Sequence, residues 1–182
     1  MQVGENALKL HLGCGKRFIP GWVHIDVVDY PHIDHVAQID NLSFIADGSC
    51  DLIYASHVLE HFKRRDVGRV LKEWFRVLKP GGVLRLAVPN FAAVSEVYQK
   101  TNALEPLLGL LFGRQDYLYN IHYHIWDETT LRVALRTAGF GEVRHWDWRE
   151  TEHAHIDDFS QAYLPHMDKN GTLMSLNMEA VK

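Results

Sequence analysis

Three groups of residues in this sequence have the types and the spacing for chemistry. The first is Gly13-Cys14-Gly15, which follows a short apolar run, together with Asp26, which ends the next apolar run. A glycine turn lets the backbone approach a ligand where a Cβ would clash, and a carboxylate at a strand end can accept both hydroxyls of a ribose. This group predicts a site for a nucleoside-bearing cofactor at the carboxyl ends of two strands.

The second group is the sequence HVLEH, which contains His57, Glu60 and His61. It matches the inverted zinc-protease pattern, and in a helix the two histidines would lie one turn apart and could bind zinc. The pattern is short enough to occur by chance, and here it directly follows a predicted strand. We therefore interpret His57 as lining the reaction site, with Glu60 or His61 orienting it or capping a helix.

The third group is the alternating pair His122 and His124 in NIHYHIWD. In an extended chain both side chains point to the same side. Three interpretations stay open: contact with the substrate or general-base catalysis, a metal site, and ordinary packed histidines. Because no second cluster has the spacing of metal ligands, the sequence predicts no metal site.

The elements that position these residues follow from hydrophobic periodicity. Strands are expected at 8–12, 22–26, 36–39, 51–55, 83–88, 142–148 and 173–181. A helix over 67–78 is expected from apolar residues on one face; its other face carries Arg65, Arg69, Lys72, Arg76 and Lys79 and is interpreted as solvated. Short helices are expected within 91–125, and Asp127 is expected to cap a helix that ends at Gly139.

The first two connections between strands, residues 16–21 and 28–35, are too short for a crossover helix. The first half of the sheet is therefore expected to lack two helices and to leave an apolar face that needs a cover. A partner subunit, giving a homodimer through this helix-poor face, or one of the segments 91–125 and 149–170 would supply that cover.

Composition restricts the class of protein. The chain has 182 residues, a net charge of −4 and two cysteines. A mildly acidic chain lacks the positive field of a nonspecific nucleic-acid binder, and two cysteines do not make a disulfide scaffold. The longest apolar stretch, 104–112, is too short to span a bilayer. We expect one domain of 1–182, a cytoplasmic location, and no nucleic-acid partner or membrane span.

Three blocks of the sequence resemble class I S-adenosylmethionine-dependent methyltransferases: HLGCG at 11–15, DGSCDLIYASHVLEHF at 47–62 and RVLKPGGVLRLAVPN at 76–90. AGF at 138–140 is a smaller match. The GWVHID turn and the C-terminal tail resemble a small bacterial type-11-like subgroup often linked to surface-polysaccharide biosynthesis. The resemblance implies an α/β, Rossmann-like seven-stranded sheet of order 3-2-1-4-5-7-6 with strand seven antiparallel, and a helical substrate-side insertion around 91–125.

The resemblance also implies S-adenosyl-L-methionine as cofactor and assigns residues to it. Cofactor contacts are expected at Gly13, Cys14, Gly15, Asp26, Val27, Gln38, Ile39, Asp40, Ser56 and His57. Two positions depart from the family pattern: His11 stands where many relatives have an acid, and Arg17 stands at the usual third glycine. Arg17 suits a crossover without a helix, and it is either a solvated loop residue or a ligand of the cofactor carboxylate.

The function implied is transfer of the cofactor's methyl group to an oxygen or nitrogen nucleophile of a small-molecule or saccharide acceptor. The candidate bases are His57, His124 and His122, in that order, followed by His61. A cofactor-binding module without activity is the alternative. A nicotinamide-dependent oxidoreductase is disfavoured because Phe18 stands where G-x-G-x-x-G requires its third glycine.

Overall fold

The computed structural model describes residues 7–166 and 168–182. Its strands are β1 (Lys9–Leu12), β2 (Val23–Asp26), β3 (His35–Val36), β4 (Cys50–Ser56), β5 (Leu78–Pro89), β6 (Val143–His145), β7 (Tyr163–Leu164), β8 (Thr172–Leu173) and β9 (Ser175–Val181). Its α-helices are α1 (Val67–Val77), α2 (Phe91–Thr101), α3 (Leu108–Phe112) and α4 (Glu128–Ala138). Four 3-10 helices complete it: η1 (Leu59–His61), η2 (Glu105–Leu107), η3 (Trp148–Glu150) and η4 (Phe159–Gln161).

The main sheet has seven strands in the order β3-β2-β1-β4-β5-β9-β6. Neighbours pair in parallel except for β9, which runs antiparallel to both β5 and β6. With β9 as the seventh strand, this is the order expected from the sequence, and the antiparallel strand is confirmed. The segments between β1, β2 and β3 contain turns and no helix, so the expected loss of two crossover helices is also confirmed.

Several strand boundaries differ from the sequence prediction. The third strand was expected at 36–39 but is only His35–Val36, because Ile39 turns into the core and its carbonyl accepts a hydrogen bond from Trp74 Nε1 at 2.8 Å. The sixth strand was expected at 142–148 but ends at His145, before the start of η3 at Trp148. The seventh was expected at 173–181 and is divided into β8 and β9.

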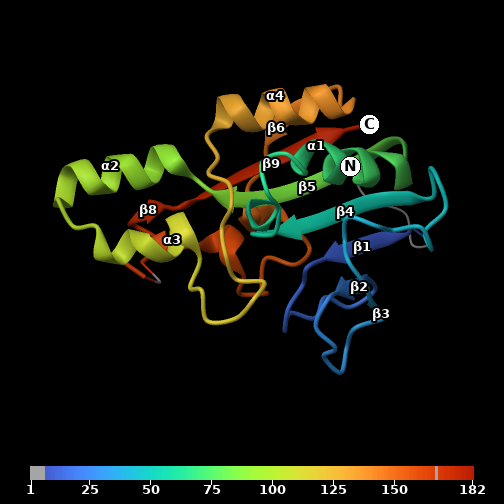
Figure 1. Cartoon of the computed structure of the whole chain (residues 1–182), viewed down its shortest axis with the longest axis horizontal. Helices are drawn as coiled ribbons and strands as arrows, with labels where there is room; N and C mark the ends of the chain where they lie inside the picture. The colour runs from blue at the N-terminus through green and yellow to red at the C-terminus, as the bar shows by residue number, and fades with distance from the viewer. Residues whose placement is uncertain (1–6, 167) are drawn as a thin grey trace.

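Helices α1 and α4 cover one face of the sheet and pack against each other (Figure 1). The apolar stripe of α1 consists of buried residues at helical spacing, among them Val70, Leu71 and Trp74. They form the main core with aliphatic residues of the strands, such as Leu10, Ile53 and Leu84. Burial of this stripe is what holds α1 in place, since an isolated helix of this length is marginal in water.

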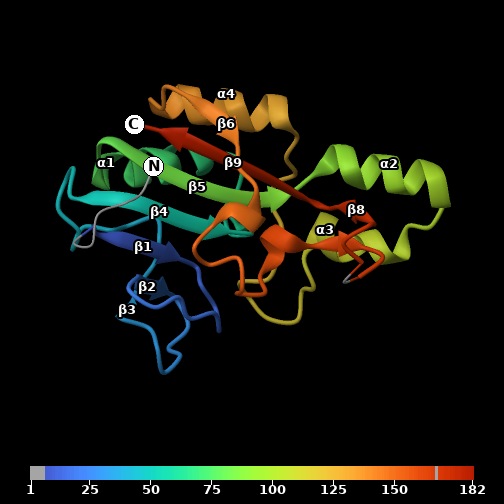
Figure 2. The same cartoon turned by 180° about the vertical axis from the view of Figure 1, so that it is seen from behind.

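The segment 146–162 covers the opposite face of the sheet (Figure 2). Beneath it lies a smaller core of Ile19, Trp22, Leu52 and Tyr54, against which Trp146 and Ile156 pack. His153 lies over Tyr54 with ring centroids 4.3 Å apart. This part of the helix-poor face is therefore covered by the chain itself; a homodimer through the face stays a prediction.

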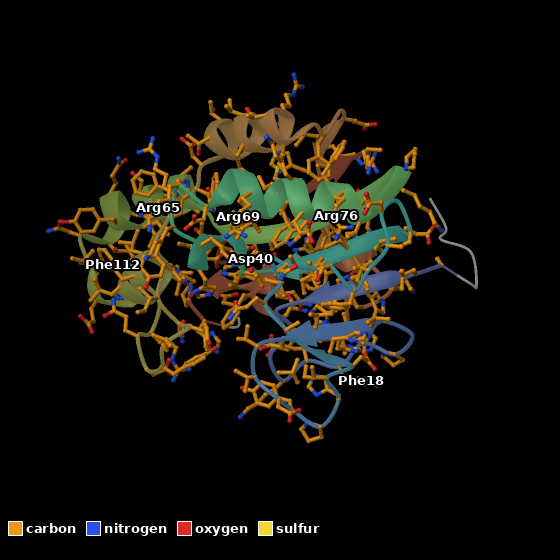
Figure 3. All side chains as sticks on the ribbon, turned by 45° about the vertical axis from the view of Figure 1, so that its right-hand side comes forward. Phe18, Asp40, Arg65, Arg69, Arg76 and Phe112 are labelled. Carbon is orange, nitrogen blue, oxygen red and sulfur yellow. The ribbon has the colours of Figure 1, made fainter. Side chains whose placement is uncertain are left out.

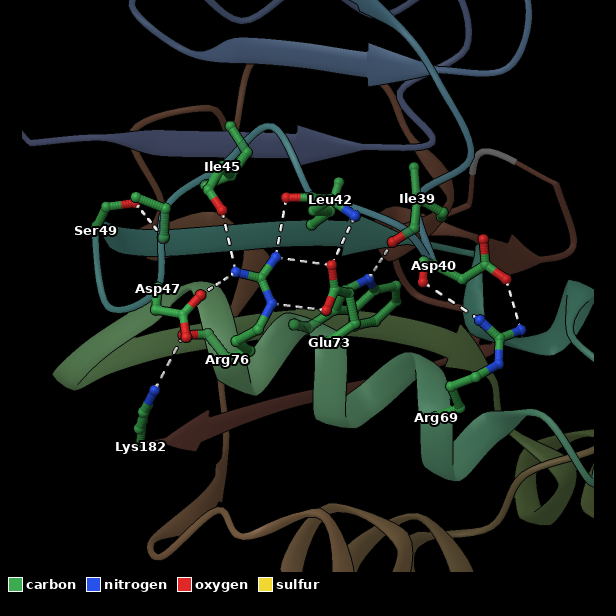
Figure 4. Close-up of polar contacts among 12 residues, drawn as sticks. Ile39, Asp40, Leu42, Ile45, Asp47, Ser49, Arg69, Glu73, Arg76 and Lys182 are labelled. Carbon is green, nitrogen blue, oxygen red and sulfur yellow. Dashed lines mark hydrogen bonds and ion pairs between the residues drawn. The ribbon is translucent and has the colours of Figure 1, made fainter.

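Residues 40–49 form a loop between β3 and β4, where a third crossover helix would lie. Side chains of α1 bind this loop (Figure 4). Arg76 donates to the carbonyls of Ile45 and Leu42 at 3.1 and 2.9 Å and pairs with Asp47. Glu73 accepts from Leu42 N at 2.7 Å. The basic face of α1, interpreted from the sequence as solvated, thus satisfies the backbone groups that a helix would have satisfied internally.

A second lobe lies beyond the carboxyl end of β5, where α2, η2 and α3 pack with β8 (Figure 1). Its small core contains Ala93, Val94, Leu107 and Met174. Among the residues described, no helix combines the length and the apolar character needed to cross a bilayer.

Candidate active site

The glycine turn follows β1 directly, and its two glycines have φ values of +62° at Gly13 and +55° at Gly15. Gly13 N donates to Ile25 O at 2.8 Å, which joins the turn to the end of β2. A Cβ at Gly13 would lie 2.7 Å from Val58 Cγ2, whereas a Cβ at Gly15 would meet only the tip of Arg17, at 3.9 Å. The turn therefore requires glycine at Gly13 for packing and leaves open space beside Gly15.

Asp26 ends β2 with a buried carboxylate that holds the turn in place. Its Oδ2 accepts from Gly15 N at 2.8 Å and its Oδ1 accepts from Val28 N at 2.9 Å. An ionised carboxylate has about four acceptor positions, so these two bonds leave positions for the hydroxyls of a ribose. The same residue thus shapes the turn and offers acceptors next to it.

Four further residues expected to contact the cofactor, Val27 and residues 38–40, are arranged differently from one another. Gln38 is exposed and Val27 is half-buried. Ile39 is buried, with its carbonyl bound by Trp74. The Asp40 carboxylate accepts from Arg69 Nη2 at 2.7 Å, and Figure 3 shows the two side chains beside each other at α1. Gln38 is therefore the side chain of this group whose polar atoms are open to solvent.

Cys14 lies within the turn and is buried, with its Sγ 4.0 Å from His32 Nε2. Burial raises the pKa of the Cys14 thiol to about 12, and the nearby Asp26 carboxylate adds to this shift. The thiol is therefore protonated near neutral pH and is not a nucleophile.

Ser56 and His57 end β4, and Ser56 Oγ lies 3.4 Å from Asp158 Oδ1. The backbone of His57 is left-handed, with a φ of +53°, and its N–H donates to Ala87 O at 2.8 Å. A positive φ is uncommon for a residue with a Cβ and occurs often at functional sites. This conformation turns the imidazole inward, between Glu60 and Ser175.

Both ring nitrogens of His57 have polar neighbours. Nδ1 lies 3.3 Å from Glu60 Oε1, and Nε2 lies 3.1 Å from Ser175 Oγ. Ser175 Oγ donates to Asn177 Oδ1 at 2.8 Å, and Asn177 Nδ2 donates to Ser160 O at 3.0 Å. Because the Ser175 hydroxyl donates its hydrogen to Asn177, its oxygen can only accept from His57, so His57 Nε2 carries the proton. The lone pair of His57 Nδ1 then faces Glu60.

The electrostatics of this pair follow from its burial. Burial lowers the pKa of His57 to about 3, with contributions from His122 and His61. Burial raises the pKa of Glu60 to about 8. Burial therefore favours the neutral form of both groups.

His122 and His124, expected on one side of an extended chain, lie in different places. His122 is directed toward Glu60, with Nε2 4.0 Å from Glu60 Oε1, and burial lowers its pKa to about 4. His124 packs on Trp126 with ring centroids 3.9 Å apart, and burial lowers its pKa too. The structure thus brings His57 and His122 together around Glu60 and leaves His124 apart from them.

Known proteins share parts of this sequence and its fold. Residues 20–86 match the family model of a methyltransferase domain. A SAM-dependent methyltransferase from Archaeoglobus fulgidus superposes with a TM-score of 0.60 at 15% identity, over 97% of this chain and 87% of that one. One from Methanosarcina mazei gives a TM-score of 0.58 at 18% identity, over 98% and 92%.

The chain has the fold of SAM-dependent methyltransferases, and its residues 20–86 match a methyltransferase domain. A third similar structure is the 1,6-didemethyltoxoflavin N1-methyltransferase of Burkholderia thailandensis, solved with its substrate and S-adenosylhomocysteine. Its TM-score is 0.57 at 15% identity, over 97% of this chain and 71% of that one. No curated protein sequence matched the chain.

Two cavities lie away from the glycine turn. One, of about 600 Å³, is lined by Asn90, residues 145–150, Leu173 and residues 175–177. The other, of about 810 Å³, lies between α1 and α4 and includes His124. Ser175 is the connection between the first cavity and His57.

The sequence did not predict two sets of contacts in this site. Asp158 accepts from Tyr54 OH and from Ser160 N, and so attaches the covering segment to the end of β4. Ser175 and Asn177 carry the hydrogen bonds that begin at His57. Their signal in the sequence was the alternation of Ser175, Asn177 and Glu179 with apolar residues in β9, which marks a strand with one polar face.

Arg17 uses its Nε to donate to Asp157 O at 3.1 Å, and its guanidinium lies 5.0 Å from the Phe159 ring centroid. Arg17 therefore joins the glycine turn to the covering segment, and its two Nη groups point to no acceptor among the described residues.

Proposed function

We propose that the chain transfers the methyl group of S-adenosyl-L-methionine to an oxygen or nitrogen nucleophile of a small-molecule or saccharide acceptor. The observation that carries this proposal is the bond between Gly15 N–H and the Asp26 carboxylate at the adjacent ends of β1 and β2. It places open backbone and spare carboxylate acceptors side by side at the carboxyl edge of the sheet, where open α/β folds bind nucleosides.

The residues present fit the cofactor. Backbone groups beside Gly15 would hold its methionine part, Asp26 its ribose hydroxyls, and the stretch from Gln38 to Asp40 its adenine. Arg17 is close enough to the turn to bind the cofactor carboxylate. When bound, the cofactor supplies an activated sulfonium methyl group.

His57 is better suited to position Ser175 than to act as a general base. A general base works best with a pKa near the working pH, whereas the pKa of His57 is about 3. Its Nε2–H holds Ser175, whose hydroxyl faces the cavity of about 600 Å³. Rate enhancement would then come mainly from holding the nucleophile in line with the methyl group, which suits an amine that arrives neutral.

The acceptor site that we propose is this cavity. Trp146 and Trp148 line it together with Asn90, Arg149 and Asn177. Indole rings with amide and guanidinium donors beside them suit an acceptor that has both apolar and polar groups, which supports a small-molecule or saccharide acceptor. The cytoplasmic location stays a prediction from the sequence.

The alternative function is an inactive module that binds S-adenosylmethionine or S-adenosylhomocysteine. One observation favours it: His57 Nε2 is bound to Ser175, and His57 Nδ1 is enclosed 3.3 Å from Glu60 Oε1. An acceptor hydroxyl would have to displace Glu60 or Ser175 to reach an imidazole nitrogen.

Calorimetric titration with S-adenosylhomocysteine tests the cofactor assignment. The wild type is expected to bind it, and Asp26→Ala is expected to bind at least several-fold more weakly. Asp26→Asn keeps an acceptor for Gly15 N–H and separates loss of charge from loss of the turn. Glu96→Ala, an exposed acid on α2, is the matched control.

Unchanged affinity in folded Asp26→Ala would refute the ribose assignment, and NAD binding without S-adenosylhomocysteine binding would refute the cofactor. Turnover with a panel of amine, phenol and saccharide acceptors then separates the enzyme from the inactive module.

A further inference from the structure

A buried cluster of Glu60, His61 and His122 lies beside the candidate active site. Each residue offers a ligand atom, and these atoms all lie within 4.8 Å of one another. Glu60 is fully buried, and neither carboxyl oxygen has a hydrogen-bond partner among the residues that the structure describes. We propose that these three residues bind a divalent transition-metal ion of the Zn²⁺ type.

The two histidine rings are oriented for coordination. His61 Nδ1 lies 3.1 Å from Ile121 O, and His122 Nδ1 lies 2.9 Å from Leu110 O. A carbonyl oxygen can only accept, so each Nδ1 carries the proton and each Nε2 keeps its lone pair. Backbone carbonyls that fix the tautomer in this way are the usual outer partners of metal-binding histidines.

The free nitrogen of His122 faces the carboxylate, and His61 lies beside His122. His122 Nε2 lies 4.0 Å from Glu60 Oε1, and the two imidazole rings lie with centroids 4.8 Å apart. A small inward movement of these side chains would bring three ligands to the separations of a tetrahedral site. Two imidazoles and one carboxylate, with a position left open, form a donor set that Zn²⁺ adopts in proteins.

The backbone holds the two halves of the cluster together without an ion. Tyr123 N and His124 N both donate to Glu60 O, at 2.8 and 3.2 Å. Gly113 allows the loop to close, because a Cβ there would lie 2.5 Å from Asn120 O and 3.1 Å from His122 Cδ2. The side chains are therefore preorganised, which lowers the entropic cost of binding.

Without a bound ion, burial of this cluster costs free energy of folding. A buried carboxyl without a hydrogen-bond partner loses its hydration without compensation, and native proteins rarely keep such groups. A metal ion would satisfy the carboxylate and both imidazoles at once.

The ligand set differs from the one that the HVLEH pattern suggests. A helix would place His57 and His61 on one face, but residues 59–61 form a 3-10 turn and His57 lies outside it with a positive φ. Its Nε2 is bound to Ser175. His122, from a distant loop, takes the place that the pattern gives to His57, so sequence spacing did not reveal the cluster.

Titration of metal-free protein with Co²⁺, followed by visible absorption and by competition with Zn²⁺, tests the proposal. We expect one equivalent of tightly bound Co²⁺ in the wild type and at least about tenfold weaker binding in Glu60→Gln and in His122→Ala. His155→Ala removes an exposed histidine outside the cluster and is expected to bind as the wild type does.

A second measurement on the wild type avoids variants that fail to fold. In nitrogen-15 NMR of the imidazoles, Zn²⁺ is expected to shift the Nε2 signals of His61 and His122 selectively. No stoichiometric Co²⁺ binding, equal binding in wild type and folded Glu60→Gln, or unselective imidazole shifts would each overturn the metal site. These readouts do not involve methyl transfer, so they test the metal site independently of the proposed function.

Discussion

The two faces of the central sheet are built from different chemistry. Toward α1 and α4, neighbouring strands present Leu10, Ile53 and Leu84, all fully buried. Toward the segment 146–162, the next residue of each strand presents a polar or aromatic group instead: His11, Tyr54 and Arg85. One face is an aliphatic core under helices, and the other is a set of rings, histidines and ion pairs under an irregular segment.

This contrast shows what can replace a crossover helix. A helix satisfies its own backbone and needs only an apolar stripe to pack, whereas an irregular cover must be attached by specific polar contacts. Asp158 binds Tyr54 OH, Arg17 binds Asp157 O, and His153 stacks over Tyr54. The face of the sheet under α1 and α4 (the helix face) should therefore contribute most of the free energy of unfolding. The face under the segment 146–162 (the covered face) should make that free energy sensitive to pH and salt.

The largest effect is expected from Trp74→Ala on the helix face. Trp74 is fully buried and donates to Ile39 O at 2.8 Å, so truncation leaves a cavity and an unsatisfied carbonyl. We expect a loss of about 3–5 kcal/mol in the free energy of unfolding. Chemical denaturation measures it, with Lys72→Ala, an exposed residue of the same helix, as the control. A loss below about 1 kcal/mol would show that the helix face is not the main core.

On the covered face, acid is expected to destabilise the protein through His153. Burial, with Arg85 next in effect, lowers the pKa of His153 from 6.5 to about 4, although Asp158 and Glu152 partly oppose this. The unfolded chain therefore binds a proton that the folded chain does not, and stability falls as the pH drops from 6.5 toward 4. The loss reaches about 3 kcal/mol at pH 4, relative to pH 7.

Unfolding curves between pH 7 and pH 4 check this, with His153→Gln as the test variant and His155→Gln as the exposed control. His11, His57 and His122, whose pKa values burial also lowers, keep part of the slope in the variant. A slope that is unchanged in folded His153→Gln would mean that the covered face does not set the acid sensitivity.

The helix face is also the part of the molecule that could be predicted from sequence. The spacing of Val67, Val70, Leu71 and Trp74 repeats along one helix face, and the order of the sheet followed from the resemblance. The short connections correctly predicted the missing helices. Local periodicity was sufficient because these contacts repeat along one element.

The covered face could not be predicted in the same way. Its contacts join residues far apart in the chain, such as Tyr54 with Asp158, and no periodicity marks them. The same holds for the candidate site, where His122 meets Glu60 only through the return of a loop. The positive φ of His57 also depends on tertiary packing, since its sequence contains no turn signal of the usual type.

A smaller effect is expected from Tyr54→Phe, which removes the hydroxyl that donates to Asp158 and keeps the ring. A hydrogen bond to a carboxylate contributes about 1.5–3 kcal/mol, and Ser56 and Ser160 remain as partners of Asp158, so we expect about 1.5 kcal/mol. Hydrogen exchange should also speed up within 146–162. Tyr98→Phe, on the exposed side of α2, is the matched control; equal behaviour of the two variants would show that this bond does not attach the cover.

The smallest effect is expected at the outer margin of the cover, where Lys9 Nζ lies 2.8 Å from Glu152 Oε1. Both side chains contact water, and exposed pairs of this kind contribute about 0.2–1 kcal/mol, so Glu152→Gln should cost less than about 1 kcal/mol. Added salt should abolish the difference, because the Debye length falls to about 3 Å at 1 M. Lys9 lies over the Trp22 ring, 5.2 Å from the centroid, so the variant removes the ion pair and leaves this contact of Lys9 in place. A cost that survives 1 M salt would mean that Glu152 acts through the buried His153 beside it, and the acid sensitivity of Glu152→Gln would then differ from that of the wild type as well.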